Sequence, residues 1–324
     1  SFSIQRCNMP DSYKFSAMIC LQMLVGLVSG QVTDIKDILQ QELRRSQPNY
    51  VVFVPGHYDG STNDAHNEHF LVFEGPDGSL MAIWTQSLQR PGPVNRIVFS
   101  TSKDGGKTWA PPSHVVGPKT PDDPAHIASW AFPMVSKSGR IYVLYNQNQG
   151  NRGWIMMHTG TMDGVYSDDN GVTWTKPQNI PMPRSPYDDP DGKIPAEWIV
   201  WQVPMRDLKG GYFVGYSHWV NRAKAWLKDV ESWTQIESVC EFMRFENVDE
   251  NPEVRDLRVK YSGWGDEALR VPHFRYPLLS IAQEPSIVRL PDKRLFCVMR
   301  TNTGYIWYSV STDDGKTWCN PRPL

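Results

Sequence analysis

The sequence has few cysteines and almost no net charge, and it lacks the short motifs of several common catalytic sites. Among its 324 residues are five cysteines, and the formal net charge is −2. So small a charge gives no electrostatic basis for binding nucleic acid or an anionic membrane surface. The patterns C-x-x-C, H-E-x-x-H and G-x-S-x-G and a glycine-rich phosphate loop are absent. The motifs therefore give no support to a zinc protease, a dithiol enzyme, a nucleotide-binding enzyme or a serine hydrolase.

An apolar run long enough to span a membrane comfortably is also missing. The run Phe15 to Val28 follows Lys14 and is too short for a span. Small residues just before Gln31 instead indicate that residues 1–30 hold a secretion signal, with Met9 as its natural initiator and Ser1 to Asn8 as upstream residues. The alternative, a buried amphipathic segment, fits less well because the run has no polar face. We expect a secreted protein with no membrane segment after signal cleavage.

Aromatic residues, by contrast, are abundant. The 13 tryptophans suit both the packing of a large β-structure and stacking on sugar rings. Loss of the signal would remove Cys7 and Cys20, and the odd number left, without close spacing, fits neither a disulfide framework nor a zinc site. The cysteines that remain are Cys240, Cys297 and Cys319.

The chain divides into three parts. After the signal, apolar residues at helical spacing between Thr33 and Arg45 predict a helix that Pro48 ends, within a lead-in over residues 31–49. From Tyr50 onward, short β-rich runs alternate with turns rich in Gly, Pro and Asp. Residues 50–324 are therefore predicted to form one all-β domain, which includes a strand at Val51 to Val54.

One short pattern, S-x-D-x-G-x-T-W, occurs three times in this domain. It begins at Ser102, Ser167 and Ser311. The Ser and Asp side chains can bond loop amides, the Gly can take a positive φ, and the Trp can pack against a sheet. Three copies in register indicate an internal repeat. We interpret each copy as a structural hairpin loop remote from the chemistry.

The pattern resembles the Asp-box, or BNR repeat, of sialidase-like β-propellers. The resemblance implies blades of four antiparallel strands arranged around a central channel. Related strand–turn–strand units pivot at Gly78, Gly139, Gly211 and Lys293, so four blades are visible. Propellers of this superfamily have six or seven blades, and open sheet edges favour aggregation. We therefore expect the chain to be a C-terminally truncated piece of a longer protein.

The third blade departs from the pattern. Its expected Asp-box position holds only Ser232 and Trp233, which predicts a degenerate blade with an insertion from Glu241 to Pro272. The turn-rich segment Pro186 to Pro190 follows the second box. Its Tyr187 either reaches the channel mouth or belongs to a solvated loop.

Polar and aromatic residues precede the innermost strand of every blade, where a propeller forms a ring around its channel. His66 and His69 are the predicted catalytic acid and base, because imidazole exchanges protons near neutral pH. Arg300, on the second strand of the fourth blade, supplies a cation for a substrate carboxylate, with a structural salt bridge as the alternative. The predicted substrate-binding residues are Asn67, Glu68, Trp130, Trp201, Gln202, Gln283, Glu284 and Arg300.

The sialidase signature itself fits poorly. Sialidases carry an F/Y-R-I-P segment just before the first inner strand, and the corresponding stretch here, His66 to Phe70, has neither Arg nor Pro. The similar letters Val288 to Pro291 fall at the turn of the fourth blade. The segments N-x-x-H-N-x-H-F-x-V, I-V-W-Q, Q-E-P-S and R-T-x-T-G instead resemble propellers that act on L-rhamnosyl-α-1,4-D-glucuronate ends of plant glycans.

This second resemblance, over Asn63 to Leu324, implies an L-rhamnose-α-1,4-D-glucuronate lyase or a related α-L-rhamnosidase acting on an oligo- or polysaccharide. In a lyase, Arg300, Gln202 and Gln283 would neutralise the uronate carboxylate, and Trp130 and Trp201 would stack on the sugars. The alternatives are a sialidase or another glycosidase using Glu68 and Glu284, and a glycan-binding propeller without catalysis. We expect a monomer without a cofactor, and a structural calcium ion stays open.

Overall fold

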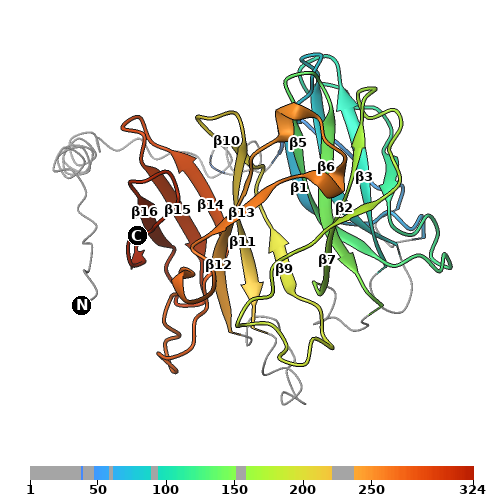
Figure 1. The fold of residues 1–324 in the computed structure, drawn as a ribbon. Coiled ribbons are helices and arrows are strands. Elements are labelled where there is room, and N and C mark those ends of the chain that lie inside the picture. Colours follow the sequence, from blue (N-terminus) through green and yellow to red (C-terminus); the bar gives the residue numbers. More distant parts are fainter. Residues whose placement is uncertain (1–37, 39–46, 58–60, 89–93, 151–157, 221–236) are drawn as a thin grey trace. The chain divides into compact units, whose positions relative to one another are not determined.

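The structure is a computed structural model that describes residues 38, 47–57, 61–88, 94–150, 158–220 and 237–324 (Figure 1). The chain divides into two compact units, Ser1–Val51 and Val52–Leu324, and the strands among the described residues lie in the second. The predicted secretion signal lies outside the described residues, as does nearly all of the predicted helix over residues 33–45. Residues 51–54 are described and form no strand, so the strand predicted there is wrong.

The second unit is all-β and consists of four antiparallel sheets arranged as the blades of a β-propeller (Figure 1). This confirms the predicted fold class. In blades 1, 2 and 4, consecutive strands pair with each other, so the spatial order follows the chain order. The strands of blade 1 are β1 (His66–Glu74), β2 (Leu80–Leu88), β3 (Val94–Ser102) and β4 (Ser113–Val116). Those of blade 2 are β5 (Ala128–Val135), β6 (Ile141–Asn148), β7 (Gly160–Ser167) and β8 (Gln178–Ile180).

Blades 3 and 4 complete the described sheets. In blade 3 the inner strand is broken into two pieces that both pair with β11. The strands of blade 3 are β9 (Glu197–Val200), β10 (Met205–Arg206), β11 (Tyr212–Trp219), β12 (Ser238–Phe245) and β13 (Val259–Ser262). Those of blade 4 are β14 (Gln283–Arg289), β15 (Leu295–Arg300), β16 (Trp307–Ser311) and β17 (Arg322–Pro323). The described residues also form the short 3₁₀ turns η4 (Val248–Glu250), η5 (Val254–Asp256) and η6 (Gly265–Glu267).

The hairpin between the first two strands pivots on a residue with positive φ in every blade. The values are 77° at Gly78, 101° at Gly139, 92° at Gly210 and 70° at Lys293. Glycine takes this conformation without the steric cost that a side chain brings. Three of the predicted pivots are confirmed, and in blade 3 the pivot is Gly210, one residue before the predicted Gly211.

The Asp-boxes form the predicted hydrogen-bonded loops at the end of each third strand. Gly106 N donates to Ser102 Oγ at 2.8 Å, and Thr108 donates to Asp104 from its backbone at 2.9 Å and its hydroxyl at 2.6 Å. The same bonds recur in the other two boxes at 2.5–2.9 Å. The bonds to Thr108 lower the pKa of Asp104 to about 2. The boxes lie at the end of the blades opposite to the start of the inner strands, so they serve as structural loops.

The aromatic residue of a box packs against the preceding blade. Trp174 meets Phe99 of blade 1 edge-on, with ring centroids 5.4 Å apart. Trp318 stacks on Phe242 of blade 3 at 4.4 Å, and Phe242 in turn stacks on Phe213 at 5.6 Å. The second and third boxes therefore each close a hairpin within their own blade and join that blade to the preceding one, whereas Trp109 of the first box packs within blade 1.

Blade 3 lacks the box, as the sequence indicates, but its insertion lies elsewhere. Glu241 falls inside β12, so the predicted excursion from Glu241 to Pro272 is wrong in its limits. Irregular chain instead flanks β13, where η4, η5 and η6 lie. Asn247 closes the loop after β12, because its side chain accepts from Arg258 N at 2.8 Å and donates to Asp256 O at 3.0 Å. Ser232 and Trp233 lie outside the described residues.

Candidate functional site

The inner strands of blades 1, 2 and 4 each carry a β-bulge near the end at which they begin, which we call the mouth end. The residue within each bulge has a left-handed backbone, with φ of 51° at His69, 51° at Trp130 and 47° at Glu284. Such values are uncommon outside glycine and cost about 1–3 kcal/mol. The same strained backbone therefore recurs at the same position of three inner strands, all at the mouth end. The strand pairing is interrupted between Glu68 and Leu71, Ser129 and Phe132, and Gln283 and Ser286.

Two of these bulges are anchored to the preceding blade. Trp130 N donates to the hydroxyl of Thr85 on β2 at 2.9 Å. Glu284 N donates to the hydroxyl of Ser217 on β11 at 2.6 Å. Thr85 and Ser217 occupy corresponding places on the second strands of their blades. The inner strands are thus held in fixed positions around the mouth.

His66 and Glu68 present the exposed acid–base groups of blade 1. They lie two residues apart on β1, so their side chains share one face of the strand, and both residues are exposed. Desolvation by neighbouring atoms raises the pKa of Glu68, and the charge of His66 opposes this shift. A carboxyl group with a raised pKa beside an imidazole can take part in proton transfer near neutral pH.

His69 has a different environment. The residue is 5% exposed, and its ring lies 5.1 Å from that of Trp201 in blade 3. Burial lowers the pKa of His69 to about 3, and an interaction with the backbone of Val200 opposes this only in part. The imidazole is therefore neutral and shielded from water at physiological pH. This argues against the predicted acid–base role, which stays untested by any measurement.

Asn67 and Gln202, predicted to bind substrate, are both engaged within the protein. Asn67 Oδ1 accepts from Trp84 Nε1 at 2.8 Å and from Gln86 Nε2 at 3.1 Å. Gln202 Oε1 accepts from Ile287 N at 2.5 Å and so joins blade 3 to blade 4. These bonds give both amides a role in holding the mouth together.

The three remaining aromatic and amide positions differ in exposure. Trp130 is 2% exposed and stacks on His158 with ring centroids 4.3 Å apart. Gln283 is 5% exposed, whereas Trp201 is 38% exposed. Of these three predicted contacts, Trp201 alone offers a large surface to a ligand in this structure.

Blade 4 supplies a cation next to a carboxylate. Arg300 Nη1 donates to Glu284 Oε1 at 2.6 Å, and the Arg300 side chain is 47% exposed while that of Glu284 is 12% exposed. Desolvation raises the pKa of Glu284, and Arg300 opposes this shift. The salt bridge predicted as the alternative for Arg300 is therefore present. Its exposed guanidinium still offers donors to a substrate carboxylate.

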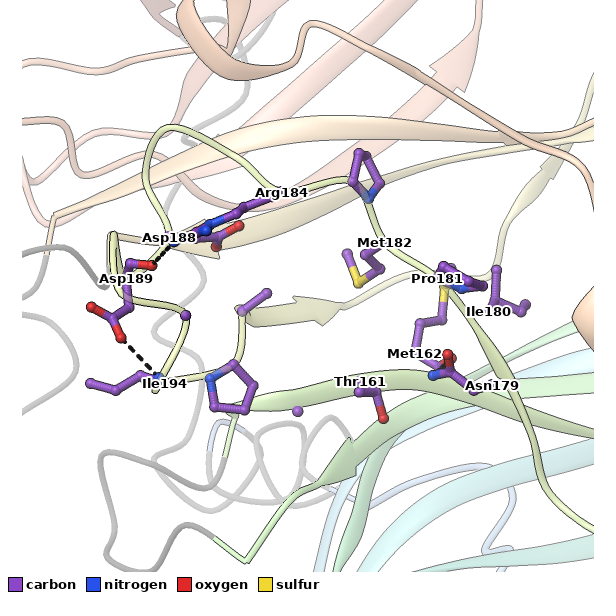
Figure 2. A pocket seen from close by; sticks show the side chains of 15 residues that line it. Thr161, Met162, Asn179, Ile180, Pro181, Met182, Arg184, Asp188, Asp189 and Ile194 are labelled. Atoms are coloured by element: carbon purple, nitrogen blue, oxygen red, sulfur yellow. Dashed lines mark hydrogen bonds between the residues drawn. The ribbon is translucent and has the colours of Figure 1, made fainter.

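Cavities occur at the mouth end of three successive blade junctions. The blade 1–2 cavity, about 460 Å³, lies between the end of β4 and His126, which precedes β5. The blade 2–3 cavity, about 320 Å³, lies beside the segment that connects β8 to β9, and Figure 2 shows Arg184 and Asp189 on its wall. The blade 3–4 cavity, about 470 Å³, lies against the segment that leads into β14. Concave space with polar side chains on its walls therefore occurs at each of these three junctions.

Comparison with known proteins identifies the family. The sequence profile of the BNR repeat-like domain matches residues 78–324, which is most of the chain. The chain belongs to this family. No curated protein matches the sequence.

Solved structures similar to this BNR repeat-like chain share its fold at low sequence identity. A protein of unknown function from Dyadobacter fermentans aligns with a TM-score of 0.55 and 15% identity, covering 80% of this chain and 69% of its own. The Hadza microbial sialidase Hz136 aligns with a TM-score of 0.56 and 14% identity, covering 80% and 47%. The intramolecular trans-sialidase from Ruminococcus gnavus gives 0.55 and 14%, covering 85% and 73%. These likenesses establish the sialidase-like propeller and leave the activity open.

The BNR repeat-like chain also contains a buried polar network that the sequence analysis missed. His218 contacts Glu241 through Nδ1 at 2.8 Å and Asp188 through Nε2 at 2.9 Å. Tyr216 donates to the same Glu241 at 2.6 Å. Burial alone would lower the pKa of His218, but the bonds and charges of Asp188 and Glu241 raise it to about 9. The sequence shows a histidine within a strand segment, but nothing in it indicates that Asp188 and Glu241 are the partners of this histidine.

The network corrects the prediction of a solvated loop after blade 2. Tyr187 is 4% exposed, and its hydroxyl donates to Gly265 O at 3.0 Å. Its ring lies edge-on to His218 at 6.2 Å. The segment that walls the blade 2–3 cavity in Figure 2 is therefore packed against blade 3.

The described residues contain no group of three or more His, Cys, Asp or Glu side chains placed to hold a metal ion. A structural calcium ion stays an open expectation. In the same part of the chain, none of the helices is long and apolar enough to cross a membrane.

Proposed function

We propose that the chain is a carbohydrate-active enzyme that removes a terminal sugar from an acidic glycan, by β-elimination at an L-rhamnosyl-α-1,4-glucuronate end. One observation carries this proposal: His66 and Glu68 are exposed on one face of β1 at the mouth end, and Glu68 has a raised pKa. The pair replaces the predicted pair of His66 and His69, because His69 is buried against Trp201.

The elimination needs three protein functions. Removal of the proton at C5 of the glucuronate requires its carboxylate charge to be compensated, and Arg300 is the exposed cation at the mouth for this task. His66 accepts the C5 proton, and Glu68 donates a proton to O4 as the C4–O4 bond breaks. The products are rhamnose and a uronate with a C4–C5 double bond. The exposed ring of Trp201 stacks on a sugar face.

Hydrolysis is the second candidate, and the carboxyl groups support it. Glu68 and Glu284 both have raised pKa values through desolvation, and a glycosidase uses two such groups on either side of the bond. Two of the structures with the same fold are named sialidases. This mechanism keeps Arg300 as the partner of a substrate carboxylate.

Product analysis separates these reactions. The protein is incubated with a rhamnosyl-glucuronate glycan and, separately, with a sialoside. Free rhamnose together with ultraviolet absorbance from an unsaturated uronate supports elimination. Rhamnose without that absorbance indicates a rhamnosidase, and free sialic acid indicates a sialidase. No product from either glycan contradicts the enzymatic proposal and favours a binding role.

A further inference from the structure

The blade 3–4 cavity has a wall of exposed aromatic side chains that the proposed reaction does not use. Phe274 is 61% exposed and Tyr276 is 62% exposed, and both line the cavity of about 470 Å³ together with Arg275. Exposed rings beside a cation are uncommon on a protein surface, since rings are usually buried. Aromatic faces that line a cavity suit the apolar faces of sugar rings.

The loop that carries these side chains is already ordered by its own hydrogen bonds. His273 Nδ1 accepts from the backbone amides of Arg275 at 3.0 Å and Tyr276 at 3.1 Å. His273 N donates to Leu279 O at 2.9 Å, which closes the loop at its base. The ring of His273 stacks on Phe274 at 4.6 Å. A preformed wall loses little conformational freedom when a ligand binds.

The cavity adjoins the salt bridge of blade 4. Asn302 lines the cavity and lies two residues after Arg300, in the bend that follows β15. Ile281, also on the wall, lies three residues before Glu284 on the other side. The cavity wall is therefore close in the chain to both residues of the salt bridge, on β14 and on β15.

We propose that the blade 3–4 cavity is a second glycan subsite, which binds an acidic sugar next to the one at the Glu284–Arg300 pair. Phe274 and Tyr276 contact the sugar ring, and Arg275, whose guanidinium lies 5.3 Å from the centroid of the Phe274 ring, pairs with its carboxylate. The inference rests on the proposed action on an acidic glycan and extends it: the substrate is a chain with more than one uronate.

Binding measurements test the subsite without any turnover. The probe is a uronate-rich arabinogalactan oligosaccharide, compared by calorimetry with the same oligosaccharide after chemical reduction of its carboxyl groups. The double variant Phe274→Ala and Tyr276→Ala is expected to bind the native probe about tenfold more weakly. Arg275→Gln is expected to lose the preference for the native over the reduced probe. The matched control is Leu208→Ala, an equally exposed apolar residue at 66% in the turn between β10 and β11.

The results of these binding measurements test the subsite independently of the proposed reaction. Weaker binding by the double variant, with wild-type affinity for Leu208→Ala, supports the subsite even when no glycan is cleaved. Wild-type affinity in the double variant overturns it, even when the chain proves to be a lyase or a glycosidase. Failure of the wild-type chain to bind the native probe also overturns it. The thermal midpoint of each variant verifies folding, and both aromatic side chains are exposed enough to remove without loss of the core.

Discussion

His66 and His69 show how three residues of separation produce opposite environments. Alternation along a strand places positions 66 and 68 on one face, and the bulge at position 69 turns the next histidine inward against Trp201. Burial then holds the His69 imidazole neutral, with its pKa lowered to about 3. A histidine with that pKa cannot supply a proton at pH 7, whereas the side chain of His66 is exposed to solvent.

The two histidines therefore predict different mutational effects. His66→Gln is expected to lower kcat by about 10²-fold or more and to leave the thermal midpoint close to that of the wild type, because the side chain is exposed. His69→Ala is expected to cost about 1–3 kcal/mol of stability through lost packing. Steady-state kinetics and thermal unfolding of both variants check this. A near-normal rate for His66→Gln would remove it from the reaction.

At the scale of the element, the Asp-box combines a backbone requirement with close packing. Gly171 has φ of 83°, and a Cβ atom there would lie 2.3 Å from the ring of Phe99 in the preceding blade. Gly315 repeats the arrangement at 2.5 Å from Phe213. The fixed spacing within the repeat therefore serves both the turn and the contact between blades. Asn146 makes a further contact between blades at the mouth end, where it donates to Trp198 O at 2.9 Å.

Substitution of single box glycines by alanine separates the requirement for a positive φ from the requirement for close packing. Gly171→Ala is expected to destabilise the fold by about 2 kcal/mol or more, because it adds a clash with Phe99 to the strain of a positive φ. Gly105→Ala is the matched control, since Gly105 has φ of 73° and a Cβ atom added there would meet no other atom within 4 Å. It should cost about 1 kcal/mol. Equal unfolding free energies for the two variants would contradict this account of the box.

At the scale of the whole domain, the His218 network joins chain segments that are far apart in sequence. Glu241 on β12 accepts from Gly265 N at 2.9 Å, while Asp188 accepts from Ser185 N at 2.7 Å, so the network ties the connection between blades 2 and 3 to blade 3 and η6. Three buried ionisable groups in contact require good hydrogen bonding to offset their desolvation. Loss of the central imidazole would leave both carboxylates without their shared partner.

The network predicts a pH dependence of stability. The pKa of His218 rises from 6.5 to about 9 on folding, so its contribution is fully present below pH 6.5 and is lost as pH rises through 9. The total is on the order of 3 kcal/mol. We expect the thermal midpoint of the wild type to fall between pH 6.5 and 9 more steeply than that of His218→Gln. Parallel curves for the two proteins would refute a charged His218 in the folded state.

The sequence by itself determined the repeated architecture. The boxes at Ser102, Ser167 and Ser311 and the regularly spaced turns such as Gly78 are local patterns, and hydrogen bonds between residues a few positions apart enforce them. The all-β class, the four blades and the missing box of blade 3 follow from such local chemistry. They could be predicted because no distant contact is needed to form them.

Only the tertiary structure decided which of the mouth residues face solvent. A bulge and a contact between blades bury His69 against Trp201. The amide of Asn67 is bonded within blade 1, and that of Gln202 is bonded to blade 4. The same kind of contact buries Tyr187 in a segment whose sequence is typical of a solvated turn. These outcomes depend on partners up to 132 positions away in the chain, as between His69 and Trp201. A local sequence pattern gives no information about partners so far away in the chain.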